Sequence, residues 1–165
     1  MSRKRAYLAS PLGFAESTRA FMAQLEAALR EVVEVDNPWS FGGPELGAAF
    51  ARANAIADYA GRAAALHALD MEIAAKNEAA IRACDLVVAV LDGVDVDSGT
   101  ASEIGFAYGL GKLSLGLRTD SRLAGDNLGS TVNLQVEYWI EASGGVVVAT
   151  VAALLAALRA RVAAG

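Results

Sequence analysis

Residues 97–103, Asp-Ser-Gly-Thr-Ala-Ser-Glu, carry the side chains with the clearest chemical potential in this chain. They follow an apolar run and lead into a stretch typical of a helix, so Glu103 is expected in or near the first helical turn. Free N–H groups and the positive end of the helix dipole would keep a carboxylate there ionised and aimed. Such a carboxylate can attack an acetal-like carbon while a second one, Asp97, assists the leaving group. The segment therefore suggests glycosidic-bond chemistry.

Simpler explanations of the same segment stay open at this point. Ser98 or Thr100 could cap the helix without any chemical role. A glycine-containing helix start could also hold a phosphate, although neither GxxxxGK[ST] nor GxGxxG occurs in the chain. The three aspartates between residues 92 and 97 would repel a phosphate, which weakens that interpretation.

The elements that must position these residues alternate between strand and helix. Strands are predicted over residues 5–9, 33–36, 86–91, 113–117 and 146–148. Helices are predicted over residues 14–32, 100–110, 132–140 and 152–163, with two more between 48 and 83, the second starting near 66. This alternation predicts an α/β fold with a parallel sheet, which binds ligands at the carboxyl ends of its strands. Residues 39–44 and 118–131 are expected to be loops, and Arg118 and Arg122 are expected to be solvated unless they meet a 5'-phosphate.

The composition limits the class of protein. The chain has 165 residues, which favours a single domain over residues 1–165, and 55% of them are hydrophobic. The net charge is -5 and no basic stripe is visible, so nucleic acid is not expected as a partner. No apolar run is long enough to span a membrane, and the one cysteine, Cys84, fits a reducing compartment, so we expect a cytoplasmic protein. No metal-ligand spacing occurs, and neither a metal nor a cofactor is expected.

Several blocks of sequence match the pattern of one known family. They are residues 7–11 (Tyr-Leu-Ala-Ser-Pro), Asn77, residues 83–93, residues 97–108 with Gly111-Lys112, and residues 132–134 (Val-Asn-Leu). On these residues the chain resembles the nucleoside 2-deoxyribosyltransferase family, from about residue 5 to residue 150. The resemblance implies a flavodoxin-like five-stranded parallel sheet flanked by helices. It also implies transfer of 2-deoxyribose between nucleobases through a covalent glycosyl-enzyme.

The same resemblance implies a role for individual residues. Glu103 matches the nucleophile, Asp97 matches the acid that helps to protonate the base, and Tyr7 matches a tyrosine whose hydroxyl lies near the nucleophile. Asn133 matches an asparagine that reaches into a neighbouring subunit's site, so the resemblance implies a homo-oligomer with shared active sites. Many members have an aspartate where this chain has Asn77. Because an amide cannot transfer a proton at neutral pH, proton supply is expected to depend more heavily on Asp97.

The remaining expected contacts are to substrate, and the expected partners are 2'-deoxynucleosides and free purine or pyrimidine bases. The residues expected to make these contacts are Ser10, Pro11, Asn37, Trp39, Phe41, Asn77, Asp92, Gly99 and Asn133. Two alternatives stay open. Water could replace the acceptor base, which would make the chain a nucleoside or deoxynucleoside 5'-monophosphate N-glycosidase, although residues 10–14 lack the arginine of related phosphate-binding loops. The chain could also be a nucleotide-binding module without turnover.

Overall fold

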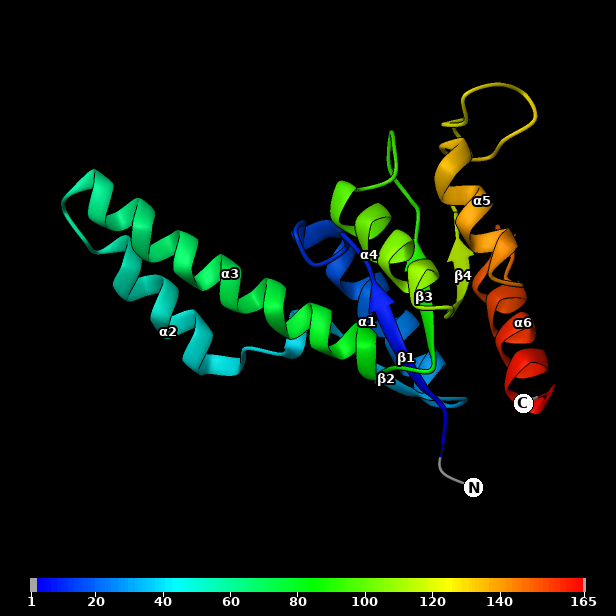
Figure 1. Ribbon diagram of the computed structural model, residues 1–165, viewed down its shortest axis with the longest axis horizontal. Coiled ribbons are helices and arrows are strands. Elements are labelled where there is room, and N and C mark those ends of the chain that lie inside the picture. Colours follow the sequence, from blue (N-terminus) through cyan, green and yellow to red (C-terminus); the bar gives the residue numbers. More distant parts are fainter. Residues whose placement is uncertain (1–2, 165) are drawn as a thin grey trace.

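Five parallel strands form the centre of the computed structural model, which describes residues 3–164 (Figure 1). They are β1 (Arg5–Ala9), β2 (Glu34–Asp36), β3 (Leu86–Val90), β4 (Leu113–Leu117) and β5 (Val147–Val148). Their order in the sheet is β2-β1-β3-β4-β5, and each neighbouring pair is parallel. This is the flavodoxin-like order, whose switch point lies between β1 and β3. The predicted fold class is therefore confirmed.

Helices cover both faces of this sheet (Figure 1). They are α1 (Glu16–Arg30), α2 (Gly43–Asn54), α3 (Tyr59–Ala83), α4 (Ser98–Gly109), α5 (Leu134–Ala142) and α6 (Val151–Ala164), with a 3-10 helix η1 (Pro38–Ser40) after β2. Side chains of α1 and α6 pack on one face, and side chains of α4, α5 and the end of α3 pack on the other. Every residue of β3 is buried, as expected for a strand covered on both sides. None of the helices within residues 3–164 is both long and apolar enough to cross a membrane.

The alternation of side chains along β1 decides which residue faces the site. Ala6 and Leu8 belong to the core under α1 and α6, whereas Tyr7 and Ala9 belong to the core under α4 and α5. Because successive residues of a strand point to opposite faces, Tyr7 is the residue at the centre of β1 that lies toward α4. Its ring is fully buried in that core.

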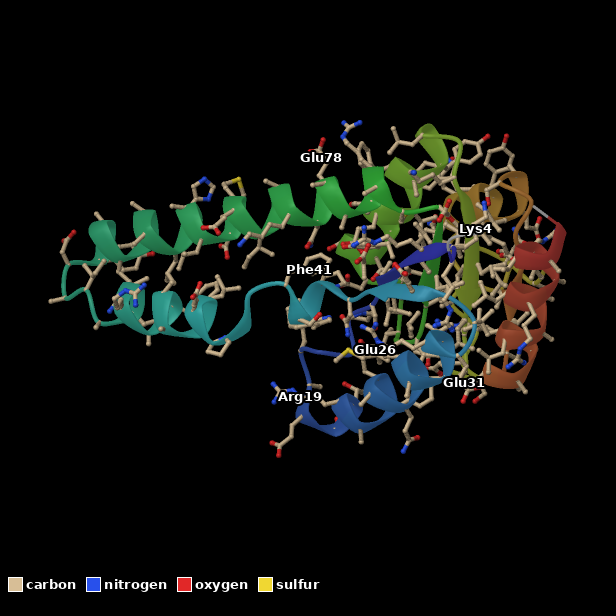
Figure 2. All side chains as sticks on the ribbon, turned by 90° about the horizontal axis from the view of Figure 1, so that it is seen from below. Lys4, Arg19, Glu26, Glu31, Phe41 and Glu78 are labelled. Carbon is tan, nitrogen blue, oxygen red and sulfur yellow. The ribbon has the colours of Figure 1, made fainter. Side chains whose placement is uncertain are left out.

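Helices α2 and α3 form a hairpin that extends away from the sheet (Figures 1 and 2). The sequence prediction was wrong about its limits, since α2 begins at Gly43 instead of residue 48 and α3 at Tyr59 instead of about residue 66. The Asp58 side chain accepts a hydrogen bond from the Gly61 amide at 2.6 Å and so caps α3. Gly61 consequently lies in the first turn, where a glycine does not interrupt the helix. The predicted loop over residues 39–44 is likewise partly helical, because η1 and the start of α2 lie within it.

The close packing of the core predicts that a substitution that leaves a cavity there lowers the free energy of unfolding. Leu115 in β4 is fully buried, so Leu115→Ala is expected to lower the free energy of unfolding by about 2–5 kcal/mol. Leu128 is 94% exposed, and Leu128→Ala is expected to change it by no more than about 0.5 kcal/mol. Urea unfolding followed by circular dichroism measures both values. Equal values for the two variants would contradict the burial of Leu115 in the core.

Candidate active site

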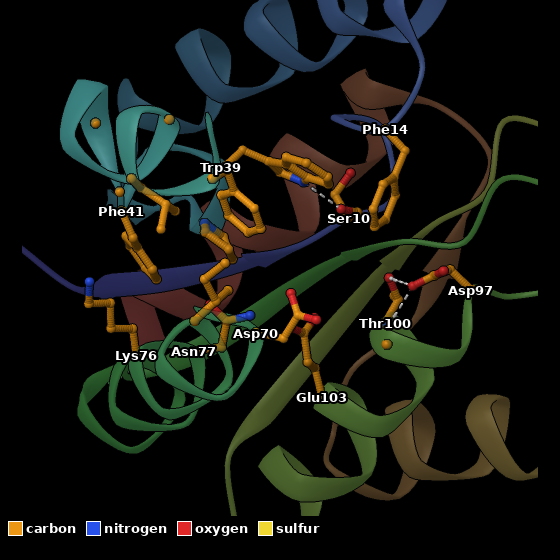
Figure 3. Close-up of a pocket in the computed structure, with 18 residues that line it drawn as sticks. Ser10, Phe14, Trp39, Phe41, Asp70, Lys76, Asn77, Asp97, Thr100 and Glu103 are labelled. Carbon is orange, nitrogen blue, oxygen red and sulfur yellow. Dashed lines mark hydrogen bonds between the residues drawn. The ribbon is translucent and has the colours of Figure 1, made fainter. Parts of the chain in front are cut away.

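The Glu103 carboxylate lies where β1 and β3 meet, at the switch point of the sheet. Glu103 is half-buried in the second turn of α4, and its Oε1 accepts a hydrogen bond of 2.5 Å from the Tyr7 hydroxyl. Its Oε2 accepts no hydrogen bond from residues 3–164, and the side chain points into a pocket (Figure 3). One oxygen is thus held and the other is free to meet a ligand.

Burial controls the protonation of this pair. Burial above all raises the pKa of Glu103 to about 7, the Tyr7 hydrogen bond lowers it, and the negative charge of Asp97 raises it again. Burial, and after it the charge of Glu103, raises the pKa of Tyr7 above its ordinary range, so the phenol keeps its proton and remains the donor. The expectation that the helix N-terminus keeps Glu103 ionised is wrong. The carboxylate lies beyond the first turn of α4, and its raised pKa of about 7 means that it gains or loses its proton near neutral pH.

Asp97 occupies the position at the helix N-terminus that was expected for another residue. Its Oδ2 accepts hydrogen bonds from the Thr100 amide at 3.0 Å and the Thr100 hydroxyl at 3.3 Å, so Asp97 is the N-cap of α4. Neither Ser98 nor Thr100 is the cap. Among residues 3–164, no donor contacts Oδ1 of Asp97, and this residue lines the same pocket as Glu103. The cap therefore fixes the second carboxylate beside the first one.

The pocket has a volume of about 580 Å³, within the range of small-molecule sites. Its wall comes from the loops after β1, β2 and β3 and from the hairpin of α2 and α3. The residues that line it are Ser10, Phe14, Pro38, Trp39, Phe41, Gly42, Gly43, Leu46, Gly47, Phe50, Asp70, Ile73, Lys76, Asn77, Asp97, Gly99, Thr100 and Glu103. Within residues 3–164, no group of three or more His, Cys, Asp or Glu side chains is placed to hold a metal ion.

The sequence-predicted site residues fall into two groups. The pocket wall contains Ser10, Trp39, Phe41, Asn77, Asp97, Gly99 and Glu103, and Tyr7 lies directly behind Glu103. Four others lie outside this wall: Pro11, Asn37, Asp92 and Asn133.

Three of these four residues stabilise turns or a helix start. Asn37 is buried, donates to Glu26 Oε2 at 2.7 Å and accepts from the Trp39 amide at 3.1 Å, so it shapes the turn that carries Trp39. The Pro11 carbonyl accepts from the Phe14 amide at 3.1 Å in the turn after β1. Asn133 caps α5 through the Gln135 amide at 3.0 Å and borders a separate cavity between α4 and α5. Within their own chain, these three residues add no side chain to the pocket wall.

Asp92 takes part in a set of hydrogen bonds that joins the loop after β3 to the loop after β4. Its carboxylate accepts hydrogen bonds from Thr119 and from the Asp120 amide at 2.9 Å. Arg118 donates to the carbonyls of Leu91, of Gly93 at 3.1 Å and of Arg122 at 2.9 Å. Arg118 is only 3% exposed, so the prediction that it is solvated is wrong. These bonds hold the loop that leads to Asp97.

An aromatic pair forms one wall of the pocket. The Trp39 indole N–H donates to the Ser10 carbonyl at 2.9 Å, and the Phe14 and Trp39 rings meet edge to face at 4.6 Å (Figure 3). A side chain at Gly13 would overlap the Trp39 indole, so glycine permits this close approach. Phe14 is 75% exposed although it lines the pocket. Sequence reasoning missed it, and its place just after the β1 loop was the available signal.

A face of α3 forms the opposite wall, and sequence reasoning found only one of its residues. Asp70, Ile73 and Asn77 recur at helical spacing and all line the pocket. Asn77 Oδ1 is buried and has no hydrogen-bond partner within residues 3–164. The helical spacing was visible in the sequence, but α3 was expected to begin later, and nothing showed which of its faces meets the sheet.

The sequence matches one family profile, described as Nucleoside 2-deoxyribosyltransferase, over residues 6–136. The chain belongs to this family. Among curated proteins, none matches it in sequence. In this member of the nucleoside 2-deoxyribosyltransferase family, Tyr7, Asp97 and Glu103 lie together at the pocket beside a parallel five-stranded sheet.

Solved structures agree with this assignment. A conserved protein from Enterococcus faecalis is 26% identical, with 97% of this chain and 99% of that one covered and a TM-score of 0.68. A 2-desoxiribosyltransferase from Leishmania mexicana is 25% identical, with coverage of 93% and 95% and a TM-score of 0.61. A CMP N-glycosidase from Clostridium botulinum shares the fold at 22% identity, with coverage of 96% and 99% and a TM-score of 0.56.

The pair of Tyr7 and Glu103 predicts a pH dependence for any reaction that uses ionised Glu103. Because the pKa of Glu103 is raised to about 7, kcat/KM should fall as the pH drops below about 7, where the carboxyl becomes protonated. Tyr7→Phe removes a hydrogen bond that lowers this pKa, so the acidic limb should move to higher pH. Initial rates of deoxynucleoside cleavage between about pH 4.5 and 9 measure both effects. Tyr59→Phe, at a residue that is 77% exposed, is the control, and an unmoved limb in Tyr7→Phe would contradict the assigned role.

Proposed function

We propose that this protein transfers 2-deoxyribose from a 2'-deoxynucleoside to a second nucleobase through a covalent intermediate on Glu103. The observation that supports this proposal most directly is the half-buried Glu103 carboxylate, held by Tyr7 on one oxygen and open to a pocket on the other. Membership of the nucleoside 2-deoxyribosyltransferase family supports the same reaction.

The reaction has two displacements. Glu103 attacks C1' while the bond from C1' to the base nitrogen breaks, and the bonding electrons leave with the base, which takes up a proton. Asp97 is the carboxyl group beside the departing base, and it donates this proton. A nitrogen of a second base then attacks C1', the bond to Glu103 breaks and leaves a carboxylate, and the incoming base gives its proton to Asp97. Two inversions give net retention, as in retaining glycoside hydrolysis.

The charges of the pocket favour a nucleoside over a 5'-nucleotide. The wall contains three carboxylates, at Asp70, Asp97 and Glu103, and no arginine. Its one lysine, Lys76, contacts Glu72 Oε1 at 2.7 Å. A doubly charged phosphate would meet net repulsion in such a site, whereas a neutral sugar and base would not. The aromatic rings of Trp39 and Phe14 offer faces suited to a neutral base.

Hydrolysis is the second candidate function. The mouth of the pocket is open, with Phe14 75% exposed, so water can reach C1' of a glycosyl-enzyme. The fold shared with a CMP N-glycosidase is compatible with an N-glycosidase activity of this chain. Release of free 2-deoxyribose with and without an acceptor base separates the two reactions. Base-independent release would favour the hydrolase.

The position of Asn133 supports the proposal that active sites are shared between the subunits of a homo-oligomer. It lies outside the pocket of its own chain, at the exposed start of α5, and its side-chain oxygen caps that helix. Its amide N–H groups remain free within residues 3–164. If Asn133 contacts substrate, as its position in the family pattern implies, it must therefore do so in a neighbouring copy.

The nucleophile assignment predicts a large loss for a nearly isosteric change. Glu103→Gln keeps the shape of the side chain but removes the nucleophilic oxygen, so exchange between deoxyinosine and adenine should fall by about 10³-fold or more. Separation of the nucleosides by chromatography measures the exchange. Glu141→Gln, on the exposed face of α5, is the matched control. Undiminished exchange in Glu103→Gln would rule out the nucleophile.

The role of Asp97 predicts a dependence on the leaving base. Asn is as good an N-cap as Asp, so Asp97→Asn should keep α4 in place while removing the acid. Cleavage should slow by about 10²-fold or more for a poor leaving base and much less for a good one. The comparison uses 2'-deoxyuridine and its 5-fluoro derivative, with Asp95→Asn as control because Asp95 lies outside the pocket. Equal slowing of both substrates would refute proton donation by Asp97.

A further inference from the structure

The pocket extends beyond the catalytic residues into the space between α2 and α3. This outer part, which we name the outer chamber, is lined by Leu46, Gly47 and Phe50 from α2, by Ile73 from α3 and by Phe41. Phe41 lies where the hairpin meets the sheet domain (Figures 2 and 3). The four large side chains are apolar and half-buried. They expose apolar surface to the pocket instead of closing against one another, so the outer chamber suits an apolar ligand group.

Along α3, the outer chamber lies farther from the sheet domain than Asn77, the residue that faces the base. Asn77 is the α3 residue of the pocket nearest the sheet domain, and its buried Oδ1 has no partner within residues 3–164. Ile73 and Asp70 lie one and two turns farther along the helix, about 6 and 10 Å from Asn77 along its axis. A base whose edge meets Asn77 therefore leaves this outer space unfilled.

A glycine in the middle of α2 keeps the outer chamber open. Gly47 lines the pocket, and a Cβ placed on it would meet nothing within 4 Å. Glycine inside a helix is unfavourable relative to alanine, and the neighbouring Ala48 shows that α2 readily uses alanine. The local preference of the helix thus gives no reason for glycine at this position, whereas an occupant lying against the backbone of α2 does.

We propose that the outer chamber binds an apolar alkyl or aryl substituent carried by the nucleobase on its edge opposite the glycosidic nitrogen. This inference rests on the proposed function and names its substrate class: purine 2'-deoxynucleosides, or acceptor purines, with an apolar group on the exocyclic nitrogen. The Asn77 side chain lines the pocket on the side where that nitrogen lies. Asp70 at the outer end of the pocket disfavours acidic substituents.

The test compares 2'-deoxyadenosine with N6-benzyl-2'-deoxyadenosine as donors to one acceptor base. The ratio of kcat/KM, substituted over parent, is expected to be about 10 or more in the wild-type protein, because the benzyl group is buried on binding. Gly47→Leu fills the outer chamber and should lower this ratio at least tenfold. Ala48→Leu, an exposed neighbour on the same helix that does not line the pocket, should leave the ratio unchanged.

The outcomes separate this inference from the proposed function. Exchange of the parent with a wild-type ratio of 1 or less overturns the outer-chamber assignment alone, as expected if a second copy of the chain fills the space. A ratio equally changed in Gly47→Leu and Ala48→Leu also overturns it. If neither nucleoside is cleaved, the proposed function fails. Calorimetry with the free bases then tests the outer-chamber inference by itself. N6-benzyladenine must bind the wild type at least tenfold more tightly than adenine, and equal affinity overturns the inference.

Discussion

The hydrogen bond from the Tyr7 hydroxyl to Glu103 connects the centre of the sheet to the chemistry of the pocket. Tyr7 is fixed because β1 is buried between β2 and β3 and its ring is enclosed by the core under α4. Glu103 is fixed because α4 packs on the same face. A carboxylate buried without a donor would be strongly disfavoured in its charged form. The phenol, which keeps its proton, offsets part of that cost and leaves Glu103 balanced between its two protonation states near a pH of about 7.

The second carboxylate is held by different means. Asp97 caps α4, so the residue that begins the helix is also the one beside the departing base in the proposed reaction. Its loop is held at the other side by the buried Arg118 guanidinium, which joins the segments after β3 and β4. The proposed nucleophile and the proposed acid thereby belong to one helix, and their relative position depends on that helix being capped and packed. The hairpin of α2 and α3 adds the apolar half of the pocket, and the end of α3 packs in the same core as α4.

Local sequence patterns predicted much of this arrangement. The continuous apolar run of β3, the Asp-x-Gly-Thr block and the alternation of strand and helix were sufficient for the fold and for the pairing of Asp97 with Glu103. Helix limits were less predictable, because an alanine-rich segment continues its helical pattern without a marked break, and only the Asp58 cap defines where α3 begins. Trp39 was an open choice between base stacking and packing, and it lies in the pocket wall against Phe14.

By itself, the sequence predicted the alternation of strands and helices and the segment that carries Asp97 and Glu103, because these are short-range patterns. The flavodoxin-like sheet and the pairing of Tyr7 with Glu103 were implied only by the family resemblance. Only the tertiary structure decided the protonation of Glu103, since burial is a property of the packed site and not of the helix that carries the residue. It also decided that Arg118 is buried, and that one face of α3 and Gly47 of α2 form an outer chamber. Long-range packing sets these features, and no local spacing encodes them.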